Sequence, residues 1–221
     1  MASNQHKRKT YIIVIFANIF SVLSFMVSIK HRELEYLLVL PLPKEVQQHV
    51  MYFKNVFKDT YDFPNALITY PHLTLLKFMQ FENYEGAIIN KLIQLAWYVS
   101  PFQVILNGFR FFERVFYIDV ATGSAILDIV YNQRSSLLPL LRAGKNRYHF
   151  TRNAHVTIAR GLLQLQRLEI SRSWKIPSYQ AAFIASQMLL LKRTTAYSPY
   201  KPVNTIRFIG NKSYPKQGDL F

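Results

Sequence analysis

Two short apolar segments each hold a histidine that is followed two residues later by a threonine. The segments read PHLTLLKF, at 71–78, and AHVTIAR, at 154–160. Successive side chains of a β-strand point to opposite faces, so each histidine shares a face with its threonine, while the apolar residues between and after them face the other way. The pattern predicts two strands with one buried face and one face that presents an imidazole beside a hydroxyl. The four polar side chains are His72, Thr74, His155 and Thr157.

The three-residue pattern alone is weak evidence, because the chain holds a third copy among only six histidines. That copy, His149 to Thr151, lies in the basic stretch KNRYHFTRN rather than in an apolar run. We interpret it as part of a loop. The matching context of the other two copies is what favours a functional interpretation of them over a structural one.

Strand and helix patterns alternate along the rest of the chain, in the order β-α-β-α-β-β-β-α-β-α-β-β. The predicted strands cover 35–43, 71–78, 102–109, 110–115, 116–121, 154–159, 179–193 and 204–210, and the predicted helices cover 44–61, 83–99, 124–144 and 162–174. Each histidine strand follows a long helix. The layout therefore suggests a duplicated unit of strand, helix and histidine strand.

Three local signals refine the boundaries of these elements. The dipeptide Asn107-Gly108 predicts a turn between the first two of the three central strands. Pro139 predicts a break in the helix at 124–144, and Gly144 predicts a cap at its end.

The first 33 residues differ from the remainder of the chain. The basic stretch HKRKT precedes an apolar run at 11–29, which carries no charge and is barely long enough to span a bilayer. Basic residues flank both ends of the run, so the orientation stays open. We rank a membrane anchor first, a start at Met26 second and a cleaved signal peptide last, because no small-x-small cleavage site follows. Residues 1–33 are expected to be a leader and residues 34–221 the functional domain.

Composition and motifs limit the chemistry available to the chain. It has no cysteine, which excludes disulfides, thiolate catalysis and cysteine-based zinc sites. It also lacks an H-E-x-x-H sequence, a phosphate-binding glycine loop and a G-x-S-x-G elbow. The formal net charge is +15, which favours a polyanionic partner such as nucleic acid or an anionic membrane face. We expect neither a metal ion nor a cofactor.

The two histidine strands suit metal-free chemistry at phosphorus. If they lie side by side, two imidazoles and two hydroxyls converge. An imidazole with its ordinary pKa of about 6.5 can act as base or acid near neutral pH, so the pair can deprotonate a nucleophile and protonate a leaving oxygen. The threonines can donate hydrogen bonds to the phosphate oxygens on which charge develops. These residues leave open which histidine is the acid and which the base.

The segments PHLTLLKF and AHVTIAR resemble the paired signatures of the two-histidine (2H) phosphoesterase superfamily, and most of all its bacterial 2′–5′ RNA ligase and cyclic phosphodiesterase family. Arg160 matches an arginine that often ends the second signature. The resemblance implies an α+β fold in two lobes, with two antiparallel sheets flanking a central groove, helices outside and a pseudo-two-fold axis. It further implies action on 2′,3′-cyclic phosphates or 2′–5′ linkages of RNA or nucleotides.

Two interpretations of function stay open. The first is a metal-independent phosphodiesterase or 2′–5′ RNA ligase, with His72 and His155 as the acid/base pair. The second is a non-catalytic RNA-binding or membrane-tethered protein on the same fold, which the basic charge and the apolar leader favour. We expect an RNA or nucleotide substrate, membrane contact only through residues 11–29, a monomer, and a cytoplasmic location that is membrane-anchored if the leader is a span.

Weaker candidates lie outside the two strand motifs. Arg160 could bind the substrate phosphate, or it could only end a strand at the surface. Tyr70 and Tyr200 could stack on a base, although the core or the surface is the commoner place for a tyrosine. A basic run could follow an RNA backbone or form a solvated loop. It comprises Arg142, Lys145, Arg147 and Arg152.

Overall fold

The computed structural model describes residues 32–143, 147–176 and 178–211. Those from Glu33 onward belong to one compact unit, which we describe by itself. The leader expected at 1–33, with its apolar run at 11–29, lies outside the described residues apart from its last two positions, so its role stays a prediction. No helix within the described ranges is both long and apolar enough to cross a membrane.

In the described part of the chain, nine strands form one sheet. The strands are β1 (Glu33–Pro41), β2 (His72–Phe81), β3 (Phe102–Phe112), β4 (Val115–Val120), β5 (Tyr148–Phe150), β6 (His155–Arg160), β7 (Gln180–Ala185), β8 (Gln187–Arg193) and β9 (Lys201–Arg207). The helices are α2 (Lys44–Tyr61), α3 (Glu85–Ala96), α4 (Gly123–Arg142) and α5 (Gln164–Ser173), with short 3₁₀ turns η1 (Pro64–Leu67) and η2 (Glu82–Tyr84).

The sheet consists of two halves that meet at a single residue pair. The strand order is β7-β3-β4-β6-β2-β1-β8-β9, and β5 pairs with β2 beside this path. Between the halves, β6 pairs with β2 only at Val156 and Leu73. The pairings on either side of this joint are antiparallel. The expected α+β fold built from antiparallel sheets is confirmed. The pair between Leu73 and Val156 connects the two expected sheets into a single sheet.

Each half repeats a unit whose helix packs across the joint. In the first unit α2 connects β1 to β2, and these two strands pair with each other. In the second unit α4 lies between β4 and β6, which also pair. Helix α2 packs against β6, whereas α4 packs against β2. Each helix thus contacts the histidine strand of the other half. A pseudo-two-fold axis through the joint relates these two contacts, because it would exchange α2 with α4 and β6 with β2.

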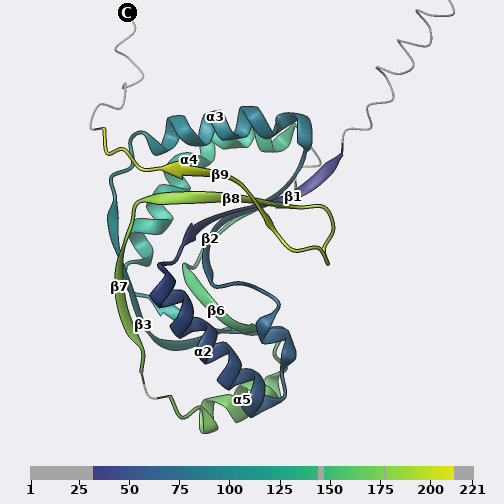
Figure 1. The fold of residues 1–221 in the computed structure, drawn as a ribbon, viewed down its shortest axis with the longest axis vertical. Coiled ribbons are helices and arrows are strands. Elements are labelled where there is room, and N and C mark those ends of the chain that lie inside the picture. Colours follow the sequence, from purple (N-terminus) through teal and green to yellow (C-terminus); the bar gives the residue numbers. More distant parts are fainter. Residues whose placement is uncertain (1–31, 144–146, 177, 212–221) are drawn as a thin grey trace, which may run out of the picture. The chain divides into compact units, whose positions relative to one another are not determined.

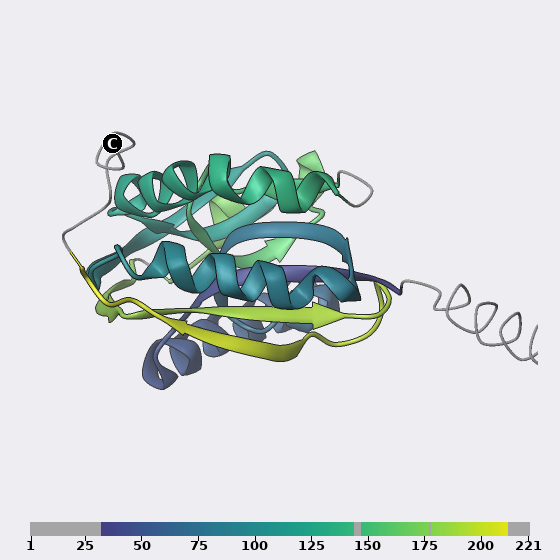
Figure 2. The ribbon, with the colours of Figure 1, turned by 90° about the horizontal axis from the view of Figure 1, so that it is seen from above.

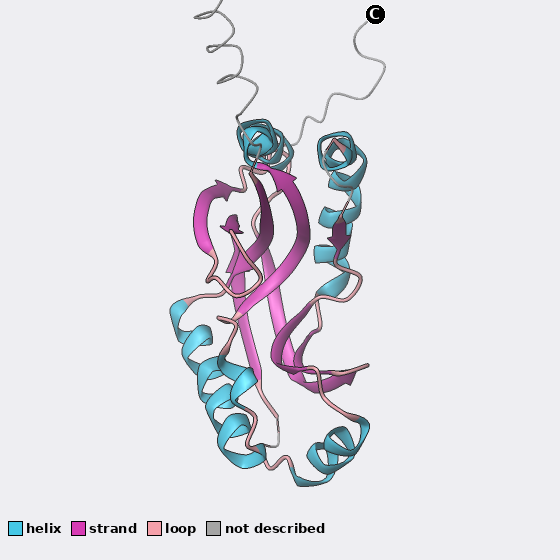
Figure 3. Ribbon diagram, turned by 90° about the vertical axis from the view of Figure 1, so that its right-hand side faces the viewer, coloured by secondary structure: helices cyan, strands magenta, loops and turns pink. Residues whose placement is uncertain are grey.

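Helices lie at both ends of the sheet. Figure 1 shows α3 and α4 together at one end and α2 and α5 together at the other, and Figure 3 shows the strands between these two groups. Helices α3 and α4 contact each other and run side by side in Figure 2. Helix α2 is held by a buried apolar stripe at helical spacing. Its members are Val46, Val50, Phe53 and Phe57.

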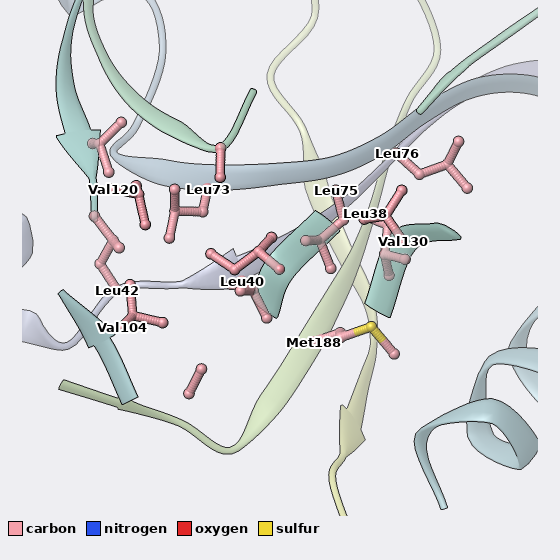
Figure 4. Packing of buried hydrophobic residues seen from close by; sticks show 14 of the residues in the cluster. Leu38, Leu40, Leu42, Leu73, Leu75, Leu76, Val104, Val120, Val130 and Met188 are labelled. Carbon is pink, nitrogen blue, oxygen red and sulfur yellow. The ribbon is translucent and has the colours of Figure 1, made fainter. Parts of the chain in front are cut away.

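One apolar core continues through both halves. Figure 4 shows leucines of β1 and β2 packed near valines of β3, β4 and α4. Leu40 and Leu73 of the first half and Val104 of the second have no exposed surface. Because burial of apolar surface is the main favourable term in folding, this shared core holds the two histidine strands in a fixed relation.

The hairpin predicted at Asn107-Gly108 is wrong. Strand β3 runs through both residues, and its pairing with β4 shifts between Leu106 and Phe109, so the glycine lies at a bulge. Gly108 has a φ of 74°, a left-handed conformation that glycine adopts without strain, which is why the same dipeptide also suits a turn. The chain turns instead after Phe112, where Glu113 has a φ of 47°.

The break predicted at Pro139 is also wrong, because α4 continues to Arg142. A proline inside a helix lacks one N–H and crowds the carbonyl four residues earlier, which belongs to Ser135. Ser135 and Pro139 are both exposed, so water can hydrogen-bond to that carbonyl and the helix tolerates the proline. Gly144, the expected cap, lies outside the described residues.

The single strand expected at 179–193 is two strands. Strand β7 ends at Ala185 and pairs with β3, whereas β8 begins at Gln187 and pairs with β1 and β9. Ser186 separates them, and its carbonyl accepts a hydrogen bond from the N–H of Phe208. Between β7 and β8, which follow each other along the chain in Figure 1, the chain crosses from one half of the sheet to the other. The apolar pattern continues through this crossing, so periodicity gave no sign of it.

Candidate functional site

The polar residues of the two motifs meet at the joint between the halves. Leu73 pairs with Val156, and both have no exposed surface, so the residues on either side of each face away from the core. Continuing this antiparallel register by one residue sets each histidine beside the threonine of the other strand. The four half-buried side chains that share this face are His72, Thr74, His155 and Thr157.

Both histidines are held in the same way. His72 Nδ1 lies 2.6 Å from the carbonyl oxygen of Tyr70, and His155 Nδ1 lies 2.8 Å from that of Asn153, in each case two residues earlier. A carbonyl only accepts hydrogen bonds, so each Nδ1 must carry the proton. Each Nε2 is left to exchange a proton with a ligand, and within the described residues neither Nε2 has a hydrogen-bond partner. The matching geometry orients both imidazoles before any ligand arrives.

The third His-x-Thr copy contributes to the site through its threonine. The loop predicted there is wrong for 148–150, because β5 forms and pairs with β2. His149 is exposed on this strand. Thr151, however, is 5% exposed, and its hydroxyl donates a 3.1 Å hydrogen bond to the carbonyl of Asn153. The carbonyl oxygen of Asn153 therefore accepts hydrogen bonds from both Thr151 and His155. The bond from Thr151 holds this oxygen in place, and the oxygen in turn orients the His155 imidazole.

A tyrosine lies against the second histidine on the other side. The ring centroids of Tyr117 and His155 are 5.2 Å apart, and the Tyr117 hydroxyl accepts a 3.4 Å hydrogen bond from Asn153 Nδ2. Tyr117 is buried on β4. Sequence reasoning did not single it out, because one tyrosine among 14 carries no distinguishing local pattern.

The site favours neutral imidazoles. Burial lowers the pKa of His72 to about 4, and the nearby charges of Arg160, Lys54 and His155 act in the same direction, against the hydrogen bond to Tyr70. Burial and Arg160 also lower the pKa of His155, against the hydrogen bond to Asn153. Both imidazoles are therefore unprotonated at neutral pH in the free protein. The negative charge of a bound anion would offset the positive charges of Arg160 and Lys54 and would favour protonation of the two imidazoles.

Sequence reasoning missed Lys54, a residue of α2 that lies behind the site. It is 1% exposed, and its ammonium group donates hydrogen bonds to the carbonyl oxygens of Ala66 and Ile158, at 2.7 Å and 3.4 Å. Burial, followed by the charge of Arg160, lowers its pKa to about 8. Its position was available from the sequence, because Val46, Val50 and Lys54 recur at the four-residue spacing of one helix face.

Arg160 ends β6 on the same side of the joint. Its side chain is exposed, and Nη2 donates a 3.3 Å hydrogen bond to the hydroxyl of Thr157, so the guanidinium turns back toward the motif. The chain then turns at Gly161, whose φ of 85° favours glycine. The Gly161 N–H is bound by the carbonyl of Arg114, which fixes the end of the strand.

The two tyrosines proposed for base stacking differ in accessibility. Tyr70 is 66% exposed and donates a hydrogen bond to Gln47 Oε1, which leaves its ring open on the segment that leads to His72. Tyr200 is half-buried, with its hydroxyl bound to Glu35 and the Arg193 guanidinium 4.6 Å from its ring centroid. Tyr70 is the better placed of the two for a base.

The predicted basic run is only partly described. Arg142, Arg147 and Arg152 are exposed, and Lys145 lies outside the described residues. Their exposure fits either an RNA-facing or a solvated surface.

A cavity of the structure lies away from the histidines. A cavity of about 650 Å³ lies between α3 and α4, with Leu95, Phe102, Ile129 and Gln133 among its lining residues, and none of the motif residues lines it. We therefore locate the candidate site by its convergent titratable groups. No group of three or more potential metal-binding side chains is present in the described ranges.

Comparisons with known proteins identify the family. The model of the 2′-5′ RNA ligase superfamily matches residues 43–196, more than half of the chain. Among solved structures, TT0787 of Thermus thermophilus has a TM-score of 0.60 at 17% identity and covers 80% of this chain and 98% of its own. Escherichia coli LigT complexed with 3′-AMP has a TM-score of 0.55 at 15% identity, covering 80% and 98%. No curated protein matches the sequence.

The family match agrees with the antiparallel α+β fold. At these identities the solved structures show a shared fold. The chain belongs to the 2′-5′ RNA ligase superfamily, and it is an enzyme of the 2H phosphoesterase type.

Proposed function

We propose that this enzyme is a metal-independent phosphodiesterase that acts on 2′,3′-cyclic phosphates or 2′–5′ linkages of RNA or nucleotides. His72 and His155 are the acid/base pair, and Thr74, Thr157 and Arg160 bind the phosphate. The observation that carries the proposal is the matched orientation of the two imidazoles, each held by the carbonyl two residues earlier. Two preset Nε2 atoms at one joint are what proton transfer on both sides of a phosphorus atom requires.

The reaction follows from this arrangement. One imidazole takes a proton from a water molecule as its oxygen attacks phosphorus, and the other imidazole donates a proton to the ribose oxygen as the P–O bond of the cyclic phosphate breaks. A phosphomonoester and a free hydroxyl result, and the two imidazoles have exchanged protonation states. When a ribose 5′-hydroxyl takes the place of water, the same two proton transfers open the cyclic phosphate, break its bond to the 3′-oxygen and form a 2′–5′ linkage, so hydrolysis and ligation use one site.

The charges around the site support a phosphate ligand. Arg160 and Lys54 both act on His72, and no carboxylate pairs with Lys54 within the described residues. A site with unbalanced positive charge attracts an anion, and threonine hydroxyls add neutral donors. The bound phosphate raises the pKa of the imidazoles, which supplies the protonated histidine that the leaving group needs.

Three further expectations remain part of this proposal. The functional domain begins at residue 34, the enzyme acts as a monomer, and any membrane contact is made by residues 11–29.

Solved structures of Escherichia coli LigT include complexes with 3′-AMP, ATP, NADP+ and phosphate. These complexes favour a nucleotide or RNA substrate for the present enzyme as well.

The test compares turnover of a 2′,3′-cyclic nucleotide by the wild type, His72→Ala and His155→Ala, with EDTA present. We expect wild-type activity in EDTA and a loss of about 10²- to 10⁴-fold in each variant. His149→Ala is the matched control, because His149 is exposed on β5 and should leave the rate unchanged. Full activity in both histidine variants would contradict the assignment. If the wild type turns over neither this substrate nor a 2′–5′ dinucleotide, the proposed substrate class is wrong.

A further inference from the structure

Lys54 is the one charged side chain that is fully buried in the described part of the chain. It occupies the inward stripe of α2 beside Val50, Phe53 and Phe57. Burial of a charge is costly unless hydrogen bonds satisfy it, so an apolar residue would be the simpler choice at this position. The lysine therefore calls for an explanation beyond packing.

The Lys54 ammonium contacts both the segment that precedes His72 and the strand that carries Thr157. It donates to the carbonyl of Ala66 at 2.7 Å and to the hydroxyl of Thr69 at 3.4 Å, in the segment that leads to His72. It also donates to the carbonyl of Ile158 at 3.4 Å, the residue after Thr157 on β6. An ammonium has three donors and no acceptor, so these three oxygens match its charged form. The contacts join the first histidine segment to the second histidine strand.

The charge of Lys54 is not neutralised locally. No carboxylate forms an ion pair with it among the described residues, and the charges that act on His72 are Arg160, Lys54 and His155. Lys54 is too deeply buried to touch a substrate. Any effect on catalysis must therefore pass through its electric field and through the segments that it holds.

We propose that Lys54 is a positioning residue of the two-histidine site, which ties the segment before His72 to the strand of Thr157 and supplies a fixed positive charge behind the phosphate. This inference rests on the proposed function for its catalytic consequence. The fixed charge strengthens binding of the anionic substrate, and it adds to the burial and the charge of Arg160 that keep His72 neutral in the free enzyme, ready to act as a base. A purely structural lysine would affect stability and leave both of these properties unchanged.

The experiment replaces Lys54 with methionine, which has similar length and no charge. Lys58→Met is the matched control, because Lys58 lies one turn later on α2, with its side chain 36% exposed and paired to Asp59 at 2.9 Å. Circular dichroism first checks that each variant is folded. If the methionine variant does not fold, Lys54→Gln takes its place, since it keeps two N–H donors without the charge.

Two measurements separate this inference from the proposed function. An NMR titration of the His72 ring needs no turnover, and we expect the Lys54 variant to raise its pKa by about 0.5 to 1 unit. The Kd for inorganic phosphate should rise about threefold or more, and KM for a 2′,3′-cyclic nucleotide should rise with it. Lys58→Met should change none of these values.

An unchanged His72 pKa together with unchanged phosphate affinity in the folded Lys54 variant would overturn the inference, whatever the wild-type activity. If both values shift while the wild type turns over no phosphodiester, the positioning role stands and the proposed reaction fails. If both values shift and the active enzyme loses substrate affinity, both proposals are supported.

Discussion

Leu73 and Val156 form the one pair between β2 and β6 in the described part of the chain, where the two halves of the sheet meet, and neither side chain is exposed. Each is the central residue of a His-x-Thr motif. The core at this point therefore sets the relation between the two imidazoles, because a shift of either strand by one residue would turn its histidine and threonine into the core. The packing of Leu73 and Val156 therefore also determines where the two imidazoles lie.

The pair should be energetically coupled. Leu73→Ala is expected to lower the free energy of unfolding by about 2 to 5 kcal/mol, because it leaves a cavity in a closed core. Val156→Ala should cost less, since it removes fewer atoms. Urea denaturation of the single and double variants should give a coupling of about 0.5 kcal/mol or more. The control pairs Val156→Ala with Ile206→Val on β9, four places away in the strand order, and there the effects should add. Additivity at both pairs would mean that the joint is not a packing unit.

Acid should destabilise the fold through His72. Its pKa is about 4 in the folded chain against 6.5 for an ordinary histidine, so between these values the unfolded chain binds more protons. The free energy of unfolding therefore falls as the pH drops from 6.5 toward 4, and His72 adds no pH dependence above that window. We expect a loss of about 1 to 3 kcal/mol from this residue.

Urea denaturation at several pH values between 4 and 7 measures this loss. The variant His72→Gln should show a smaller fall over the same range, while His149→Gln, at an exposed position, should follow the wild type. Parallel curves for all three proteins would show that His72 titrates normally.

Phosphate should raise the pKa of both site histidines. In the free protein burial is the main cause of their lowered values, and the charge of Arg160 adds to it. An anion bound among these groups opposes that charge and favours the imidazolium, by about 1 unit or more. NMR titrations with and without inorganic phosphate measure this change, with His149 as an internal reference. Equal pKa values in the two titrations would argue against a phosphate site at the joint.

Much of the site could be predicted because its information is local. The alternation around His72 and His155 fixed which side chains share a face, and the resemblance of the two motifs supplied the fold. Where each half ends could not be predicted this way. The crossing at Ser186 interrupts no apolar pattern, and the bulge at Gly108 uses the same dipeptide as a hairpin.

The residues that support the histidines were harder to predict, because their partners are distant in sequence. Lys54 is 104 residues from Ile158, and Tyr117 is 36 residues from Asn153. Only tertiary structure brings these groups together. The helix stripe could have shown that Lys54 is buried, but not which oxygens it meets. The run KNRYHFTRN looked solvated because most of it is charged or polar, yet Thr151 within it faces inward.

Thr151 should act on catalysis through Asn153. Replacing it with valine keeps the shape and removes the hydroxyl that donates to the Asn153 carbonyl, the same oxygen that holds His155 Nδ1. The carbonyl is then held less firmly, so we expect kcat to fall about threefold to tenfold with little change in KM, and stability to fall by about 1 kcal/mol. Thr151→Ser keeps the hydroxyl and should restore both. A valine variant that loses stability but keeps the wild-type kcat would limit Thr151 to a structural role, because the His155 imidazole would then be oriented without it.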